Sequence, residues 1–163
     1  GQSLPRGLEE SQELPQPLFT PTTKEDAGHD RPLSPLEVST MVGQEVARQV
    51  QEKSLAIYQY AREYVRTQGI IIADTKMEFG IKGGALILID ELLTPDSSRF
   101  WDAGKYRPGS SQPSFDKQPL RDWLVASGWD KEPPAPPLPP EIVEETAQRY
   151  REAHLKLTGK ALT

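Results

Sequence analysis

The chain has 163 residues, a length that suits one domain with a hydrophobic core. Its formal net charge of -5 argues against nucleic-acid binding driven by bulk positive charge. The chain has no cysteine, which excludes disulfides, thiolate zinc sites and a cysteine nucleophile. No apolar run approaches the roughly 18–20 residues that a membrane span needs, and no signal peptide is recognisable. We therefore expect a cytoplasmic protein that binds neither nucleic acid nor membrane.

An extended arm is expected over residues 1–35, which contain six prolines and little periodicity. Its polar side chains are dense for a simple spacer. If the arm folds back onto the rest of the chain, Lys24, His29 and Asp30 could reach a functional site. The alternative for His29 is a solvated loop histidine, which is the commoner case.

Two helices are expected next. Ser34, Pro35 and Glu37 predict a helix start, because Ser can cap, Pro suits the first helical position and Glu can close a capping box. Gly43 should interrupt this helix, and a second one should follow to about Gln68. Its apolar stripe comprises Val46, Val50, Ile57, Ala61 and Val65.

The pattern then changes to strands. The β-branched run over residues 69–74 predicts a buried strand. Residues 76–81 alternate polar and apolar side chains, Gly83 and Gly84 form a turn, and residues 85–90 are again apolar. These features predict a β-hairpin whose strands begin or end in acidic residues.

The remainder predicts a loop followed by two helices. Residues 92–114 are rich in Pro, Ser and Gly and predict a loop with Trp101 and Tyr106 as anchors. Helices are expected over residues 116–127 and 141–158, joined by a Pro-rich extended crossing. The chain as a whole therefore predicts an α+β fold in which a β-hairpin or sheet packs against helices.

An acidic cluster carries the main chemical signal. Residues at even separation in a strand point to one face, so Asp74, Lys76 and Glu78 would share a face. The hairpin would bring Asp90 back beside Asp74 or Glu78. Carboxylates crowded together repel one another unless a cation lies among them, and their oxygens suit Mg²⁺. A solvated hairpin face with Lys–Glu pairs is the alternative, and residue chemistry alone favours it.

A second signal follows in residues 93–101, where hydroxyls and Arg99 lie in a tight turn with Asp96 and Ser98. Arginine binds phosphate bidentately, and hydroxyls and turn amides add further donors. An ordinary turn with an exposed arginine is the alternative. No Walker-type or dinucleotide-binding glycine motif is present, so any phosphate-covering loop for ATP lies elsewhere.

Long motifs in a fixed order set these weak signals in context. Together they resemble the SAICAR synthetase (phosphoribosylaminoimidazole-succinocarboxamide synthase) family over nearly the whole chain. The three main segments are residues 69–80 (GIIIADTKMEFG), 90–102 (DELLTPDSSRFWD) and 114–124 (SFDKQPLRDWL), and the arm adds residues 4–8, 19–24 and 28–30.

The resemblance implies an ATP-dependent carbon–nitrogen ligase of purine biosynthesis. The family joins CAIR, a carboxylated aminoimidazole ribonucleotide, to L-aspartate and produces SAICAR, ADP and phosphate. The expected path runs through an acyl phosphate with no covalent enzyme intermediate, and it uses Mg²⁺ and ATP. The implied fold is an ATP-grasp-like C-terminal lobe.

The same resemblance implies roles at matching positions. Glu78 and Asp90 correspond to magnesium ligands, and with Lys76 they form the cofactor-binding set. Asp74 and Lys76 are implied catalytic residues beside the ATP phosphates and the reacting carboxylate. Implied substrate-binding residues are Lys24, Asp30, Asp96, Ser98, Arg99 and Lys117, with Arg99 and Ser98 on the 5′-phosphate; Asp116 belongs to a segment that closes near the site.

Two departures from the family pattern qualify these implications. Pro119 replaces a usually bulky apolar residue, which bears on Lys117 and Asp116. The family's N-terminal lobe has no counterpart, so the chain is expected to comprise the arm (1–35) and a C-terminal lobe (36–163). The alternatives are a non-catalytic magnesium- and nucleotide-binding fragment and a kinase-like phosphotransferase. The long helix and the Pro-rich crossing are candidates for an interface between copies.

Overall fold

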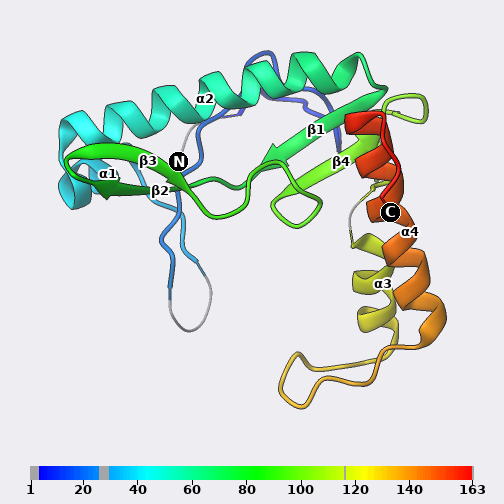
Figure 1. Ribbon diagram of the computed structural model, residues 1–163. Helices are drawn as coiled ribbons and strands as arrows, with labels where there is room; N and C mark the ends of the chain where they lie inside the picture. The colour runs from blue at the N-terminus through cyan, green and yellow to red at the C-terminus, as the bar shows by residue number, and fades with distance from the viewer. Residues whose placement is uncertain (1–3, 26–29, 116, 163) are drawn as a thin grey trace.

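The computed structural model describes residues 4–25, 30–115 and 117–162. Figure 1 shows a bent molecule, in which α2 runs along both sheets and α3 and α4 project from the end that carries β1 and β4. The α+β fold class is confirmed. The elements are α1 (Pro35–Val42), α2 (Gln44–Arg66), β1 (Ile70–Thr75), β2 (Glu78–Lys82), β3 (Ala85–Ile89), β4 (Ser98–Asp102), α3 (Gln118–Ala126) and α4 (Pro140–Thr158).

Helix α1 begins as its sequence predicts. The amide of Glu37 donates to the Ser34 hydroxyl at 3.2 Å, and the Ser34 amide donates back to the Glu37 carboxylate at 2.8 Å. This capping box satisfies two amides that the helix itself leaves unpaired. Gly43 ends the helix with a φ of 84°, a conformation that favours glycine.

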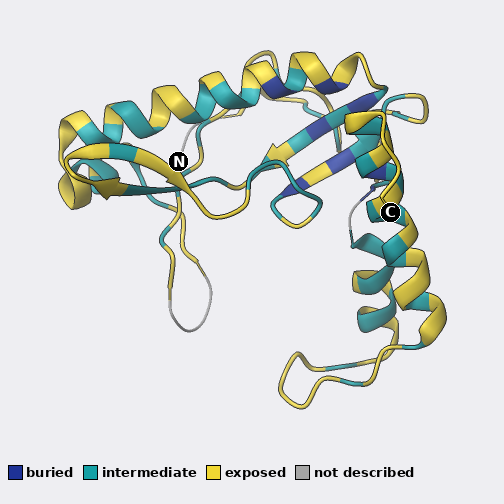
Figure 2. Cartoon of the chain, viewed as in Figure 1, coloured by how far each residue is buried: buried dark blue, intermediate teal, exposed yellow. Residues whose placement is uncertain are grey.

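Helix α2 ends at Arg66, slightly before the predicted Gln68. Of its apolar stripe, Ala61 and Val65 are buried, while the members nearer the helix start are half-buried. Figure 2 shows why: burial concentrates where the last turns of α2 lie on the sheet formed by β1 and β4.

The strands form two separate antiparallel sheets, β1–β4 and β2–β3. The predicted turn at Gly83 and Gly84 is confirmed, since Lys82 pairs with Ala85 across it. The prediction that Asp74, Lys76 and Glu78 share one strand face is wrong. The reason is that β1 ends at Thr75 and β2 begins at Glu78, so Asp74 and Glu78 belong to different sheets.

The partner of β1 is β4, which lies inside the segment predicted as a loop. The alternation of β4 is short but regular: Ser98 and Phe100 are buried, and Arg99 is exposed. The pairing joins residues some 25 positions apart, with Asp74 opposite Arg99 and a register irregularity between Ile72 and Asp74. Window-based reading of the sequence cannot detect such a partner.

A small core holds these elements together. Ile70, Ile72 and Phe100 from β1 and β4 are completely or almost completely buried. They pack with residues of α2 and α4 and with Phe115. Burying such side chains stabilises a fold by about 1.5–3 kcal/mol each. The full buried set is Ala61, Val65, Ile70, Ile72, Phe100, Phe115 and Ala153.

The arm is fixed to this body through Tyr106, one of the two residues predicted to anchor the 92–114 loop. Tyr106 stacks on Trp101 with ring centroids 6.2 Å apart. The Tyr106 hydroxyl donates to the Ser11 carbonyl at 2.8 Å and accepts from the Glu13 amide at 3.1 Å. The Tyr106 hydroxyl therefore holds the arm in place by hydrogen bonds to the arm's backbone.

The C-terminal part of the chain is helical. Helix α3 begins at Gln118 with Pro119 in its first turn, where proline costs no hydrogen bond. The predicted start at Asp116 lies outside the described residues. Within the described ranges, no helix is both long and apolar enough to cross a membrane.

Candidate functional site

The end of β1 and the facing part of β4 hold the first charged pair of the site. Arg99 donates from Nε to Asp74 Oδ1 at 2.6 Å and from Nη2 to Asp74 Oδ2 at 2.8 Å. This fork geometry fixes the guanidinium plane. Both side chains remain more than half exposed, at 54% and 57%, so the pair can also meet a ligand.

A hollow of about 330 Å³ lies beside this pair. Ser98 is buried there, and its hydroxyl is 2.8 Å from that of Thr75. Arg121, on the first turns of α3, brings a second guanidinium to the hollow. Arg121 was not among the candidate residues from the sequence, although it lies in the 114–124 segment that carries the family resemblance. The lining residues are Asp74, Asp96, Ser97, Ser98, Arg99 and Arg121.

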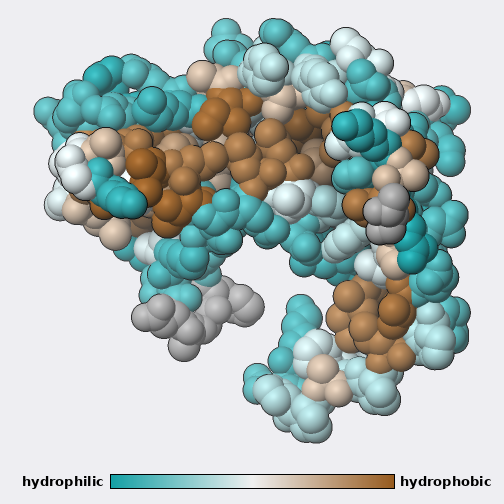
Figure 3. Space-filling view, in the orientation of Figure 1, coloured by the Kyte–Doolittle hydropathy of each residue, from teal (hydrophilic) through white to brown (hydrophobic). Residues whose placement is uncertain are grey.

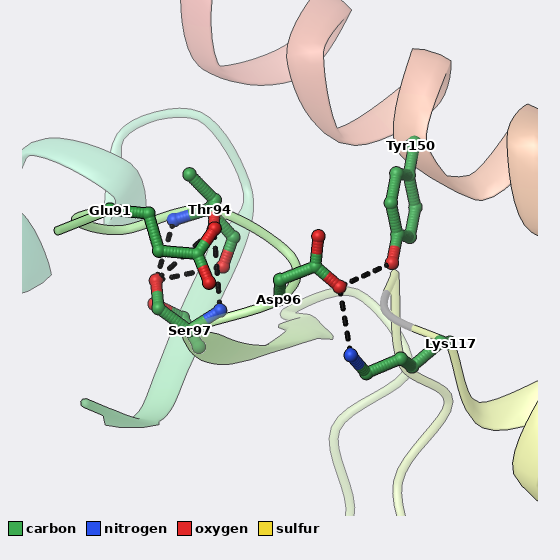
Figure 4. A network of polar contacts seen from close by, with 7 residues as sticks. Glu91, Thr94, Asp96, Ser97, Lys117 and Tyr150 are labelled. Carbon is green, nitrogen blue, oxygen red and sulfur yellow. Dashed lines mark hydrogen bonds and ion pairs between the residues drawn. The ribbon is translucent and has the colours of Figure 1, made fainter.

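The turn before β4 is held by its own side chains, as Figure 4 shows. The Thr94 amide donates to the Ser97 hydroxyl at 3.0 Å, and the Ser97 amide donates to the Thr94 hydroxyl at 3.2 Å. The Thr94 hydroxyl also lies 2.9 Å from the Glu91 carboxylate. These contacts fix a turn that presents Ser98 and Arg99 to the hollow.

Asp96, at the same turn, connects it to both C-terminal helices. Its Oδ1 atom accepts from Lys117 Nζ at 2.8 Å and from the Tyr150 hydroxyl at 2.9 Å. These two hydrogen bonds, that of Lys117 first, lower the pKa of the Asp96 carboxyl below its ordinary value. Asp96 is therefore a carboxylate at neutral pH and a fixed point between the turn, α3 and α4.

The second part of the site forms where the arm folds back onto the β1–β2 junction. Lys24 donates to Glu78 Oε2 at 2.5 Å, and Lys76 lies 3.4 Å from Asp30 Oδ2. Lys76 also lies 3.8 Å from Glu78 Oε1. The structure thus brings Lys24 and Asp30 to the strands, while His29 lies outside the described residues.

Asp90 joins this second cluster and not the first. Glu78 pairs with Ile89 in the β2–β3 register, and Asp90 follows directly with a φ of 64°. The pKa of Lys24 is raised, chiefly by its hydrogen bond to Glu78 and further by the negative charges of Asp90 and Asp30. The hairpin therefore returns Asp90 toward Glu78, and Asp74 belongs to the other sheet.

The donor set of this cluster fits a magnesium ion. Glu78 and Asp90 offer hard oxygen ligands, and Lys24 pairs with Glu78 within the electrostatic reach of Asp90. Within the described ranges, no group of three His, Asp or Glu side chains could hold a metal. Mg²⁺ does not need one, because it commonly uses one or two carboxylates and completes its shell with phosphate oxygens and water.

Comparison with known proteins identifies the family. The sequence model of SAICAR synthetase matches residues 1–136. The chain belongs to the SAICAR synthetase family. It is 55% identical to the phosphoribosylaminoimidazole-succinocarboxamide synthase of Citrifermentans bemidjiense over 163 residues, which are 99% of the chain and 55% of that protein. The corresponding enzyme of Thermodesulfovibrio yellowstonii is 56% identical over 159 residues, 98% of the chain and 54% of that protein.

Solved SAICAR synthetase structures share the fold. The SAICAR synthase of Saccharomyces cerevisiae, complexed with SAICAR, matches with a TM-score of 0.87 and 45% identity over 98% of this chain and 52% of that one. A SAICAR synthetase in complex with ADP matches with a TM-score of 0.68 and 27% identity over 93% of this chain and 55% of that one. The chain spans about half the length of the relatives it matches. We call the unmatched half of those relatives the complementary lobe.

Proposed function

We propose that the chain is the magnesium- and substrate-binding half of an ATP-dependent ligase that joins CAIR to L-aspartate. The observation that supports this most directly is the convergence of three family segments. The arm, the β1–β2 junction and the turn before β4 place their charged side chains along one connected strip. From Asp74 to Glu78 the chain can span at most about 14 Å, a separation that one ribonucleotide and one ATP phosphate tail can bridge.

The hollow beside Arg99 is the proposed site for the 5′-phosphate of CAIR. Arg99 and Arg121 supply two guanidinium groups, and Ser97 and Ser98 add hydroxyls. The Asp74 carboxylate orients Arg99 through both of its oxygens. The yeast relative is described as complexed with SAICAR, the product that would carry the same phosphate.

The Glu78 and Asp90 carboxylates are the proposed magnesium ligands. When bound, Mg²⁺ would neutralise the charge of the ATP phosphates. The relative in complex with ADP supports nucleotide binding as part of this function.

Lys76 is the residue best placed to act on the reacting groups. It lies at the junction between the two sheets, held by Asp30 at 3.4 Å and Glu78 at 3.8 Å. In the proposed reaction a CAIR carboxylate oxygen takes the γ-phosphoryl group of ATP and ADP leaves. The aspartate amine then attacks the acyl carbon, the amide bond forms, and phosphate and a proton leave. Lys76 would hold the carboxylate and the transferring phosphoryl group together by charge.

The complementary lobe is required in this proposal. We divide the chain into the arm (1–35) and a C-terminal lobe (36–163), neither of which carries a glycine-rich phosphate loop. The accessible surface is 11394 Å², whereas a compact monomer of 18.2 kDa exposes about 8100 Å². Figure 3 shows apolar side chains gathered around a wide concave face. This large exposed surface supports the proposal that residues of another lobe complete the ATP site.

Replacement of one carboxylate tests the metal assignment. In an enzyme that carries this chain with the complementary lobe, Asp90→Asn keeps the shape of the side chain and removes its charge. We expect magnesium-dependent ATP binding to weaken at least about tenfold, because a charged ligand is lost. Isothermal titration calorimetry with and without Mg²⁺ measures this.

Asp130→Asn is the matched control. Asp130 lies beyond α3, where it accepts from the Glu132 amide at 3.0 Å, far along the chain from the cluster. Its replacement should leave ATP binding unchanged. Normal Mg·ATP binding by Asp90→Asn would refute the assignment of Asp90 as a ligand.

A further inference from the structure

Tyr150 on α4 lies outside residues 1–136, the part of the chain that the family model matches. It nevertheless contacts the turn that carries the proposed phosphate-binding residues. Its hydroxyl donates to Asp96 Oδ1 at 2.9 Å across 54 positions of sequence. A helix beyond the family motifs therefore contacts the candidate site through this hydroxyl.

Asp96 receives Tyr150 and Lys117 on the same oxygen atom, as Figure 4 shows. Lys117 directly precedes α3, and the Arg121 amide donates to the Lys117 carbonyl at 3.0 Å in the first turn of that helix. Asp96 therefore fixes where α3 begins relative to the turn. The position of Arg121 depends on that start.

The hollow has two cationic walls that come from different elements. Arg99 projects from β4, two residues after Ser97, and Arg121 projects from α3. Two guanidinium groups hold a phosphate well only when their separation is fixed, since each is oriented for particular oxygens. The Asp96 carboxylate ties the turn to Lys117, directly before α3, and to Tyr150 on α4.

We infer that Tyr150 is a positioning residue for nucleotide-phosphate binding, which it supports by holding Asp96 and thereby the spacing of Arg99 and Arg121. Tyr150 does not line the hollow. It acts through Asp96, and its own contribution is to nucleotide affinity and not to the chemical steps. This inference rests on the proposed function, because it takes the hollow as the site of the CAIR phosphate.

Tyr150→Phe tests the inference, because it deletes one hydroxyl and keeps the ring. Tyr64→Phe is the matched control: its hydroxyl also contacts α4, donating to the Leu157 carbonyl at 2.8 Å, but far from the turn. The measurement is steady-state kinetics of the enzyme that carries the complementary lobe, with CAIR varied at saturating ATP and aspartate. Unfolding midpoints of both variants report any general loss of stability.

For Tyr150→Phe we expect the KM for CAIR to rise about three- to tenfold with little change in kcat, the scale of one hydrogen bond to a charged group. The Ki of inorganic phosphate as a competitor should rise in parallel. Tyr64→Phe should change neither constant. The inference is overturned if both variants shift the KM equally, or if Tyr150→Phe lowers kcat alone.

Arg99→Lys distinguishes a failure of this inference from a failure of the proposed phosphate site. If Arg99→Lys raises the KM for CAIR and Tyr150→Phe does not, the phosphate site stands and the role of Tyr150 is refuted. If Arg99→Lys also leaves the KM unchanged, the hollow is not the phosphate site and both proposals fail.

Discussion

The geometry of Arg99 is the most informative single-residue feature of the molecule. Its guanidinium is held by both oxygens of Asp74, at 2.6 and 2.8 Å, in the plane that two hydrogen bonds define. A lysine would keep the charge but present a single flexible ammonium. The fork and the charge can therefore be tested separately.

Arg99→Lys should raise the KM for CAIR about 10- to 100-fold, because one or more charge-assisted hydrogen bonds to phosphate are lost. Initial rates in the enzyme with its complementary lobe measure this. Arg48→Lys is the control, since Arg48 pairs with Glu45 and Glu52 on the far part of α2. An unchanged KM in Arg99→Lys would contradict the phosphate assignment.

The candidate site could be predicted from sequence only in part, and the reason lies in individual residues. Carboxylates near strand ends and an arginine in a turn were visible as residue types. Their partners were not visible, because Lys24 meets Glu78 across 54 positions and Arg99 meets Asp74 across 25. Arg121 was missed because an arginine on a helix is most often a solvated surface side chain. The family resemblance implied roles for individual residues, and the structure showed which of these residues contact one another.

At the level of elements, α1 shows how local chemistry sets a boundary. The backbone amide of Ser34, then its hydroxyl, then Arg31 hydrogen-bond to the Glu37 carboxylate and lower the pKa of Glu37 to about 2. Its ordinary value is 4.5. A depressed carboxyl pKa stabilises the fold above the unfolded value and loses that effect as the pH falls through the folded one.

The start of α1 should therefore weaken between pH 4.5 and about 2. Carbon NMR of the Glu37 carboxyl should give a midpoint near 2, and the amide shift of Ser34 should follow the same curve. Glu37→Gln should remove this titration from the Ser34 amide. A Glu37 midpoint near 4.5 would show that the capping box is not formed.

The two sheets differ in how strongly their packing protects them. The strands β1 and β4 contribute the fully buried Ile70, Ile72 and Phe100, whereas β2 and β3 contain no buried residue. Isolated two-stranded hairpins are only marginally stable.

Amide hydrogen exchange of the chain should consequently be slower in β1 and β4 than in β2 and β3. Exchange followed by NMR or mass spectrometry on the chain without the complementary lobe measures the difference. Equal protection of the two sheets would contradict this prediction, because β2 and β3 contain no buried residue to protect them.

Elements with local signals were predictable, and the element defined by a distant partner was not. The capping residues of α1, the glycine turn at 83–84 and the proline of α3 each act within a few positions of sequence. Strand β4 depends on β1, and the residues before it, among them Pro95 and Ser97, favour a loop on composition alone. The alternation of buried and exposed residues from Ser98 to Phe100 is the one local signal for a strand, and it is too short to outweigh that composition.

At the scale of the whole molecule, the chain exposes more surface than a compact protein of its mass. Its exposed area exceeds that of a compact monomer by about 40%, and it spans about half the length of its relatives. The hollow beside Arg99 and the acidic cluster are both formed by its own residues. These 163 residues contain no glycine-rich motif of the kind that covers ATP phosphates.

The most direct test is ADP release measured with ATP, CAIR, L-aspartate and Mg²⁺. The account predicts turnover by the chain joined to the complementary lobe only when all four are present, and none by the chain alone. Robust turnover by the isolated chain would contradict its assignment as half of the enzyme. ADP release that does not depend on aspartate would contradict the ligase and indicate a phosphotransferase.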